Sequence, residues 1–139
     1  MPPYLIRMRL GSFRTGSALA KVTVVHHLIE AMIESGRIYL QENPGAVPPL
    51  YRSGVRYRTC ESGCDWDRWC DIPEVFRDGF GDCKDLVAWR IAELATEGVG
   101  AEPIIHADLD RYGVPLYHVT LRRSDGALED PSRALGMKG

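Results

Sequence analysis

The hydrophobic pattern of the chain changes its period at Gly98. Before this glycine, two long stretches carry apolar residues every three or four positions, as on one face of an α-helix. After it, apolar and polar residues alternate, as they do in a half-buried β-strand. Helices followed by consecutive strands are typical of an α+β domain, in which the sheet is antiparallel.

Two helices are expected in the first part of the chain. Residues 17–41 have helical spacing, with Ser17 as the N-cap, a bend near Gly36, and the stretch "ENPGAVPP" as a stop because proline cannot continue a helix. Residues 84–97 form the second, with Asp82 as the N-cap and a glycine directly after its end.

The remaining segments predict strands and loops. "AEPIIHADL" and "VPLYHVTLRR" are expected as two strands joined by the turn "DRYG", and "ALEDPS" as a short third strand. "YLIRMRL", residues 4–10, alternates apolar and basic residues and predicts a further strand. Residues 50–80 predict a loop-rich segment. We therefore expect residues 1–139 to form a single α+β domain with an antiparallel meander.

Composition excludes several classes of function. A net charge of -2 gives no reason to expect nucleic acid as a partner. No apolar run approaches the roughly 20 residues of a membrane-spanning helix, and the first 20 residues make a poor signal peptide because arginines and glycines interrupt them. We therefore expect a cytoplasmic protein without a membrane partner, and the oligomeric state stays open.

The stretch "GDCKDLVAWRIAEL" places Cys83 where the second helix begins. The positive end of a helix dipole favours a thiolate over a thiol, so Cys83 is a candidate nucleophile. A nucleophilic thiol needs an imidazole within hydrogen-bond reach and an orienting partner for that imidazole. His118 in "LYHVTL" and Asp130 in "LEDPS" supply both types, and adjacent antiparallel strands can place them on one face.

"GDCKDLVAWRIAELATEGVGAEPI" followed by "YHVTLRRSDGALEDPSRALG" resembles the transglutaminase-like core of the papain-like cysteine enzymes. That family has a Gly-x-Cys at a helix start, then a strand histidine, then an Asp-Pro. Cys83, His118 and Asp130 match these positions in order, within a resemblance that covers about residues 80–135.

The resemblance implies acyl transfer without a cofactor. Cys83 would attack the carbonyl carbon of a peptide or amide substrate, His118 would act as general base and then acid, and Asp130 would orient the imidazole. The backbone N–H of Cys83 would stabilise the oxyanion. Hydrolysis is favoured over protein cross-linking, and a compact member of this kind fits a bacterial or tailed-phage protein.

The resemblance also leaves an alternative function. The family often has an aromatic residue soon after the histidine, where this chain has Val119 and Thr120. A second oxyanion donor is not assigned, and Trp66 and Trp69 are the candidates. The domain could instead be a catalytically inactive binding or assembly module, for example in a phage particle.

Other residues compete for these roles. Cys83 could be a small buried apolar residue. Cys60, Cys64 and Cys70 invite a zinc site, although the paired Cys-x2-Cys spacing of convincing sites is missing. His106 is the rival imidazole for His118. His26 and His27 are taken as structural, because adjacent helix positions point in different directions.

Overall fold

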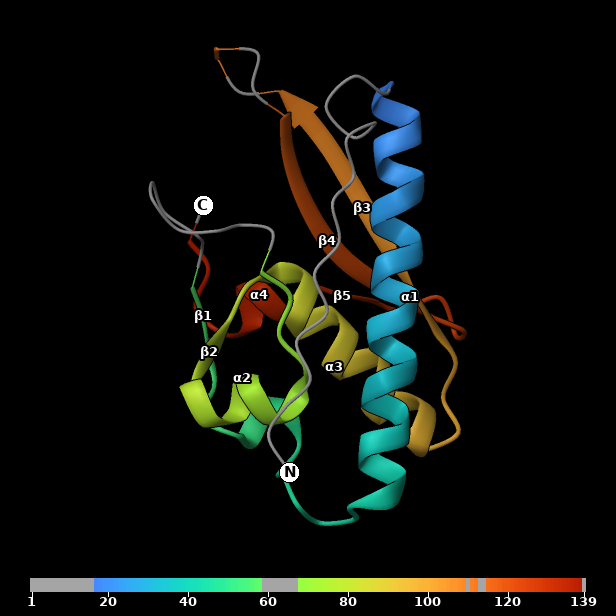
Figure 1. Ribbon diagram of the computed structural model, residues 1–139, viewed down its shortest axis with the longest axis vertical. Helices are drawn as coiled ribbons and strands as arrows, with labels where there is room; N and C mark the ends of the chain where they lie inside the picture. The colour runs from blue at the N-terminus through green and yellow to red at the C-terminus, as the bar shows by residue number, and fades with distance from the viewer. Residues whose placement is uncertain (1–16, 59–67, 110, 113–114, 139) are drawn as a thin grey trace.

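The computed structural model describes residues 17–58, 68–109, 111–112 and 115–138, and the predicted strand at residues 4–10 lies outside them. Two long helices and an antiparallel meander appear in the predicted order, which confirms the α+β class (Figure 1). The elements are α1 (Ala18–Glu42), the 3-10 helix η2 (Leu50–Arg52), β1 (Arg56–Tyr57), α2 (Ile72–Asp78), β2 (Phe80–Gly81), α3 (Cys83–Thr96), β3 (Ala101–Leu109), β4 (Pro115–Arg123), β5 (Leu128–Glu129) and α4 (Pro131–Ala134).

The main sheet has the strand order β3-β4-β5, with both pairs antiparallel. The antiparallel pairing of the two predicted strands is confirmed, and its register sets His106 opposite His118. Asp110 and Gly113 of the predicted turn lie outside the described residues. The third strand is shorter than predicted. It ends at Glu129, because Asp130 caps α4 and Pro131 occupies the first position of that helix, where its missing N–H costs nothing. A second small sheet pairs β1 with β2 in parallel.

Both long helices begin as the sequence predicts. The hydroxyl of Ser17 accepts the backbone N–H of Ala20 at 3.1 Å and caps α1. Asp82 caps α3 through a capping box, in which its carboxylate accepts the N–H of Asp85 while the Asp85 carboxylate accepts the N–H of Asp82. Cys83 is therefore the first residue of α3.

The helix α2 was not predicted. Asp71 caps it by accepting the N–H of Glu74 at 3.2 Å, proline occupies its first turn, and Gly79 ends it in the left-handed region at φ 83°. These signals stand in the sequence, but seven residues are too few to display a helical period.

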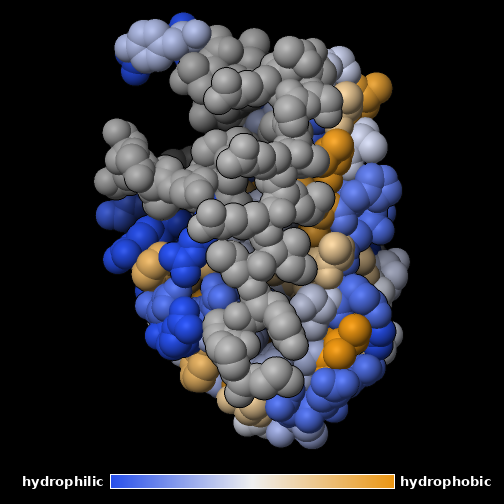
Figure 2. All heavy atoms as spheres, in the orientation of Figure 1, coloured by the Kyte–Doolittle hydropathy of each residue, from blue (hydrophilic) through white to orange (hydrophobic). Residues whose placement is uncertain are grey.

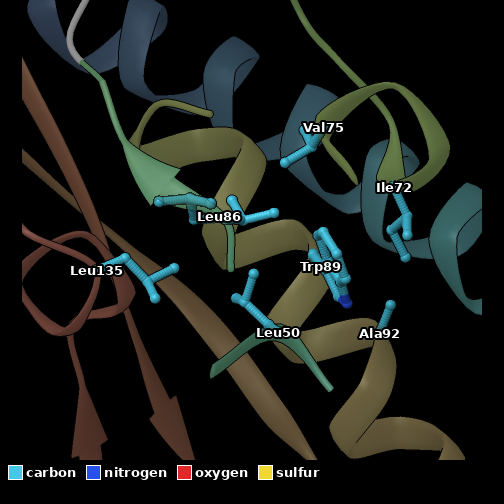
Figure 3. Packing of buried hydrophobic residues seen from close by; sticks show 8 residues of the cluster. Leu50, Ile72, Val75, Leu86, Trp89, Ala92 and Leu135 are labelled. Atoms are coloured by element: carbon cyan, nitrogen blue, oxygen red, sulfur yellow. The ribbon is translucent and has the colours of Figure 1, made fainter. Parts of the chain in front are cut away.

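The hydrophobic core consists of two clusters that both include residues of α3, and Figure 3 shows the cluster that contains Trp89. In this cluster Trp89, which is 1% exposed, packs with residues from η2, α2 and the C-terminal turn. In the other cluster, α3 packs against α1 and β4. The two clusters are Leu50, Val55, Ile72, Val75, Leu86, Trp89, Ala92 and Leu135, and Val25, Ile29, Val87, Ile91, Leu94, Val119 and Leu121.

Gly36 marks the point where α1 passes closest to its neighbours. The helix α1 continues without interruption through Gly36, from Ala18 to Glu42, and a bend there stays a prediction. A Cβ at Gly36 would lie 3.0 Å from Cδ1 of Ile72 and 3.1 Å from Cβ of Ala92. The glycine therefore lets α1 approach α3.

Candidate active site

Cys83 lies at the N-terminal end of α3, directly below β4. Its side chain is partly buried and packs against the cluster that contains Val119. The backbone N–H of Val119, the residue that follows His118 in β4, lies close enough to the sulfur to lower the pKa of the thiol. The fold thus places the sulfur of Cys83 next to the peptide bond between His118 and Val119.

The thiol of Cys83 differs from the sequence-based expectation. Burial and the Asp82 carboxylate raise its pKa to about 11, although the N–H of Val119 and the ammonium of Lys84 lower it. Burial, which penalises the charged thiolate, is the largest of these effects. Cys83 is therefore a thiol at neutral pH, and it needs a base to become a nucleophile.

His118 and Asp130 are brought together as the sequence predicts. Nε2 of His118 lies 2.9 Å from Oδ2 of Asp130. Asp130 directly follows β5, whose last residue Glu129 pairs with Leu121 of β4. Both side chains are mostly buried, at 27% and 21% exposure, so the bond is shielded from water. This hydrogen bond fixes the orientation of the His118 ring and leaves its Nδ1 atom for a second partner.

The pairing of thiol and imidazole is less direct. Among the described residues, the hydrogen bonds include none between the sulfur of Cys83 and the ring of His118. Catalytic hydrogen bonds are often long or poorly aligned before a substrate binds, so this geometry is compatible with a Cys–His pair.

An ion-pair network holds β5, the strand that ends directly before Asp130. The guanidinium of Arg90 in α3 donates two hydrogen bonds to the carboxylate of Glu129, at 2.8 and 3.2 Å, and a third to Glu93 at 2.8 Å. The hydroxyl of Tyr51 donates to Glu129 at 2.7 Å. β5 is thereby fixed to α3, the helix that begins at Cys83.

Two buried charges near Cys83 were missed at the sequence level. Lys84 is 7% exposed and Asp85 is 6% exposed. Lys84 pairs with Asp82 and lies 5.2 Å from the ring centre of Trp69, and Asp85 accepts the N–H of Cys70 at 3.1 Å. A lysine in the first turn of a helix is unfavourable because its charge opposes the helix dipole. This unusual position was the sequence signal that could have drawn attention to Lys84.

The other histidines of the chain have partners outside the Cys83–His118–Asp130 set. Nε2 of His106 lies 3.0 Å from the hydroxyl of Thr120, and its ring stacks on that of His118 with centroids 6.2 Å apart. His106 is exposed. In α1, Nδ1 of His26 lies 2.6 Å from Glu30, a surface pair within the helix.

The cysteines of the alternative zinc site are only partly within the described residues. Cys60, Cys64 and Trp66 lie outside them. Cys70 and Cys83 are both free thiols, and burial raises the pKa of Cys70 to about 12. Within the described ranges, no three His, Cys, Asp or Glu side chains gather as metal ligands would.

Comparisons of the chain with protein-family models, with curated proteins and with solved structures find no match. None of the helices in the described part of the chain has the length and apolar character needed to cross a membrane.

Proposed function

We propose that the protein is a cysteine-dependent hydrolase or acyltransferase of the transglutaminase-like type, acting on a peptide or amide bond. The proposal rests on where the structure places Cys83, His118 and Asp130. Cys83 begins a helix, its sulfur meets the backbone beside His118, and His118 is bonded to Asp130 at 2.9 Å.

In this mechanism His118 accepts the thiol proton at Nδ1 while the sulfur attacks the carbonyl carbon of the substrate. The same imidazole returns the proton to the leaving amine, and a thioester to Cys83 remains. Water or a second amine then attacks the thioester and regenerates the thiol. Because Cys83 is protonated at rest, His118 is required at the step of attack.

The first turn of α3 supplies a donor for the oxyanion. The first N–H groups of a helix have no acceptor within the helix, and the N–H of Cys83 belongs to this set. Removal of one oxyanion donor typically costs about 3 kcal/mol of transition-state stabilisation. The ring centre of Trp69 lies 5.2 Å from Nζ of Lys84, the residue after Cys83, so Trp69 would form part of the substrate site.

Two observations support a second candidate, a binding or assembly module whose triad is not used. The pKa of Cys83 is raised rather than lowered. In addition, α1 leaves Leu19 and Ile38 exposed, at 76% and 43%, and Figure 2 shows separate apolar patches with polar atoms between them on the side where α1 lies. In an assembly module, these exposed side chains would be the first positions to test for contact with another protein.

An amidase assay separates the two candidates. A mixture of fluorogenic peptide amides is incubated with the protein, with and without an added primary amine as acyl acceptor. Turnover that is lost in Cys83→Ala and falls by about 10²–10⁴-fold in His118→Ala supports the enzyme. Turnover that persists in Cys83→Ala contradicts it, and incorporation of the amine would identify a transferase.

A further inference from the structure

The first turn of α3 contains a lysine in an unfavourable place. Lys84 is the second residue of the helix and is 7% exposed. Its ammonium lies near the positive end of the helix dipole, and burial of a charge costs free energy unless the charge is paired.

The neighbours of Lys84 are two carboxylates and an aromatic ring. Its Nζ pairs with Oδ2 of Asp82 and lies 5.2 Å from the ring centre of Trp69. Burial alone would lower the pKa of Lys84, but Asp85 and Asp82 raise it above its usual value. The lysine therefore remains charged inside the protein.

Asp82 has two separate tasks. Oδ1 accepts the N–H of Asp85 at 3.3 Å and caps the helix, and Oδ2 binds Lys84. A carboxylate suits the cap, but its negative charge lies directly before Cys83 and opposes a second negative charge on the sulfur. Lys84 lies directly after Cys83 and offsets that charge.

We propose that Lys84 is a positioning residue for Cys83, whose ammonium neutralises the capping carboxylate of Asp82 so that the sulfur can carry negative charge during attack. The inference rests on the proposed role of Cys83 as nucleophile. The other charged group that acts on Cys83 is Asp85, also in the first turn of α3. Of Asp82, Lys84 and Asp85, only Lys84 is a cation.

Four variants separate this electrostatic role from a structural one. Lys84→Met removes the ammonium and keeps an apolar stem, and Lys84→Arg keeps the charge. Asp82→Asn removes the opposing charge and preserves the cap, because asparagine is as good an N-cap as aspartate. The double variant removes both charges. Thermal unfolding monitors whether each variant is folded.

The readout is the rate constant for alkylation of Cys83 by iodoacetamide between pH 7 and 10, with each cysteine assigned by peptide mapping. We expect Lys84→Met to react about threefold to tenfold more slowly at each pH, since fewer thiolates form and each is only slightly more nucleophilic. Lys84→Arg should stay within about twofold of the wild type because it retains the charge. Asp82→Asn should react faster, and the double variant should return toward the wild-type rate.

Equal rates in folded Lys84→Met and wild type would overturn the inference, as would an Asp82→Asn variant that reacts no faster. If Lys84→Met does not fold, the alkylation rates of Asp82→Asn and Lys84→Arg test the inference. An Asp82→Asn rate above that of the wild type and a Lys84→Arg rate close to it would support the role of Lys84. Alkylation requires no substrate, so the role of Lys84 is tested even if no hydrolysis is found. Conversely, turnover that depends on Cys83 but not on Lys84 would overturn this inference and leave the proposed function intact.

Discussion

Asp130 joins two elements of the site through its two carboxylate oxygens. Oδ2 lies 2.9 Å from Nε2 of His118, and Oδ1 accepts the backbone N–H of Arg133 at 3.3 Å. The same side chain therefore caps α4 and orients the imidazole. The two tasks can be separated, because a cap needs only an oxygen acceptor, whereas the bond to a protonated imidazole is strengthened by a negative charge.

Asp130→Asn is expected to keep the fold and lose activity. The amide oxygen can still cap α4, so the midpoint of thermal unfolding should change little. Loss of the charge should lower turnover by about 10²–10⁴-fold, as expected for the orienting residue of a triad. Asp130→Ala is the matched control, since it removes the cap as well and should also lower stability by about 1 kcal/mol. Full activity in Asp130→Asn would exclude the orienting role.

Arg90→Met is expected to destabilise the protein. The side chains of Arg90 and Glu129 are each 16% exposed, and that of Glu93 is 10% exposed. Removal of the guanidinium leaves two buried carboxylates without their main partner, which should cost about 3–5 kcal/mol in chemical unfolding. Arg122→Met is the control, because the Arg122–Glu102 pair is exposed and should contribute less than about 1 kcal/mol. Similar losses in both variants would contradict the structural role of the network.

Gly36→Val is expected to disturb the packing of α1 on α3. Cβ alone would meet Cβ of Ala92 at 3.1 Å, and the branched side chain adds further overlap. Overpacking of this kind typically costs about 1–3 kcal/mol, measured as the free energy of unfolding. Ser35→Val places the same side chain at an exposed neighbouring position of the same helix and should have a much smaller effect. If the two variants have equal stability, α1 does not approach α3 as closely as described.

Asp85 predicts a specific pH dependence of stability. Burial and the neighbouring Asp82 raise its pKa to about 7, above the value of about 3.9 in an unfolded chain. Between these values the folded protein binds more protons than the unfolded chain, so the contribution of Asp85 to stability falls as pH rises from about 4 to 7. The free energy of unfolding of wild type relative to Asp85→Asn should therefore decrease between pH 5 and pH 8. If this difference in the free energy of unfolding is constant or increases with pH, the pKa of Asp85 is not raised by burial.

The relation between His118 and Asp130 could be predicted because it depends on local order in the chain. A hairpin and a short turn connect β3, β4 and β5, so alternation of side chains and antiparallel pairing place the two residues on one face. The capped start of α3 was likewise visible, since Asp82 and Asp85 form a capping box within four residues.

Other features depend on contacts between distant segments. The burial of Lys84 and Asp85 arises where Trp69 and the N–H of Cys70 meet the first turn of α3. The sequence shows two ordinary surface-type charges there. Likewise, the raised pKa of Cys83 follows from burial under β4, which the helix-start position alone could not indicate.

Acyl-enzyme trapping tests the nucleophile most directly. The protein is mixed with an activated ester of a blocked amino acid, quenched in acid after a short time, and each cysteine is assigned by peptide mapping. A hydroxylamine-sensitive thioester on Cys83, formed at least about 100-fold more slowly in His118→Ala, is the predicted result. Acylation of Cys83 that is no faster than that of Cys60, Cys64 or Cys70, or that is indifferent to His118, would contradict the Cys–His–Asp mechanism.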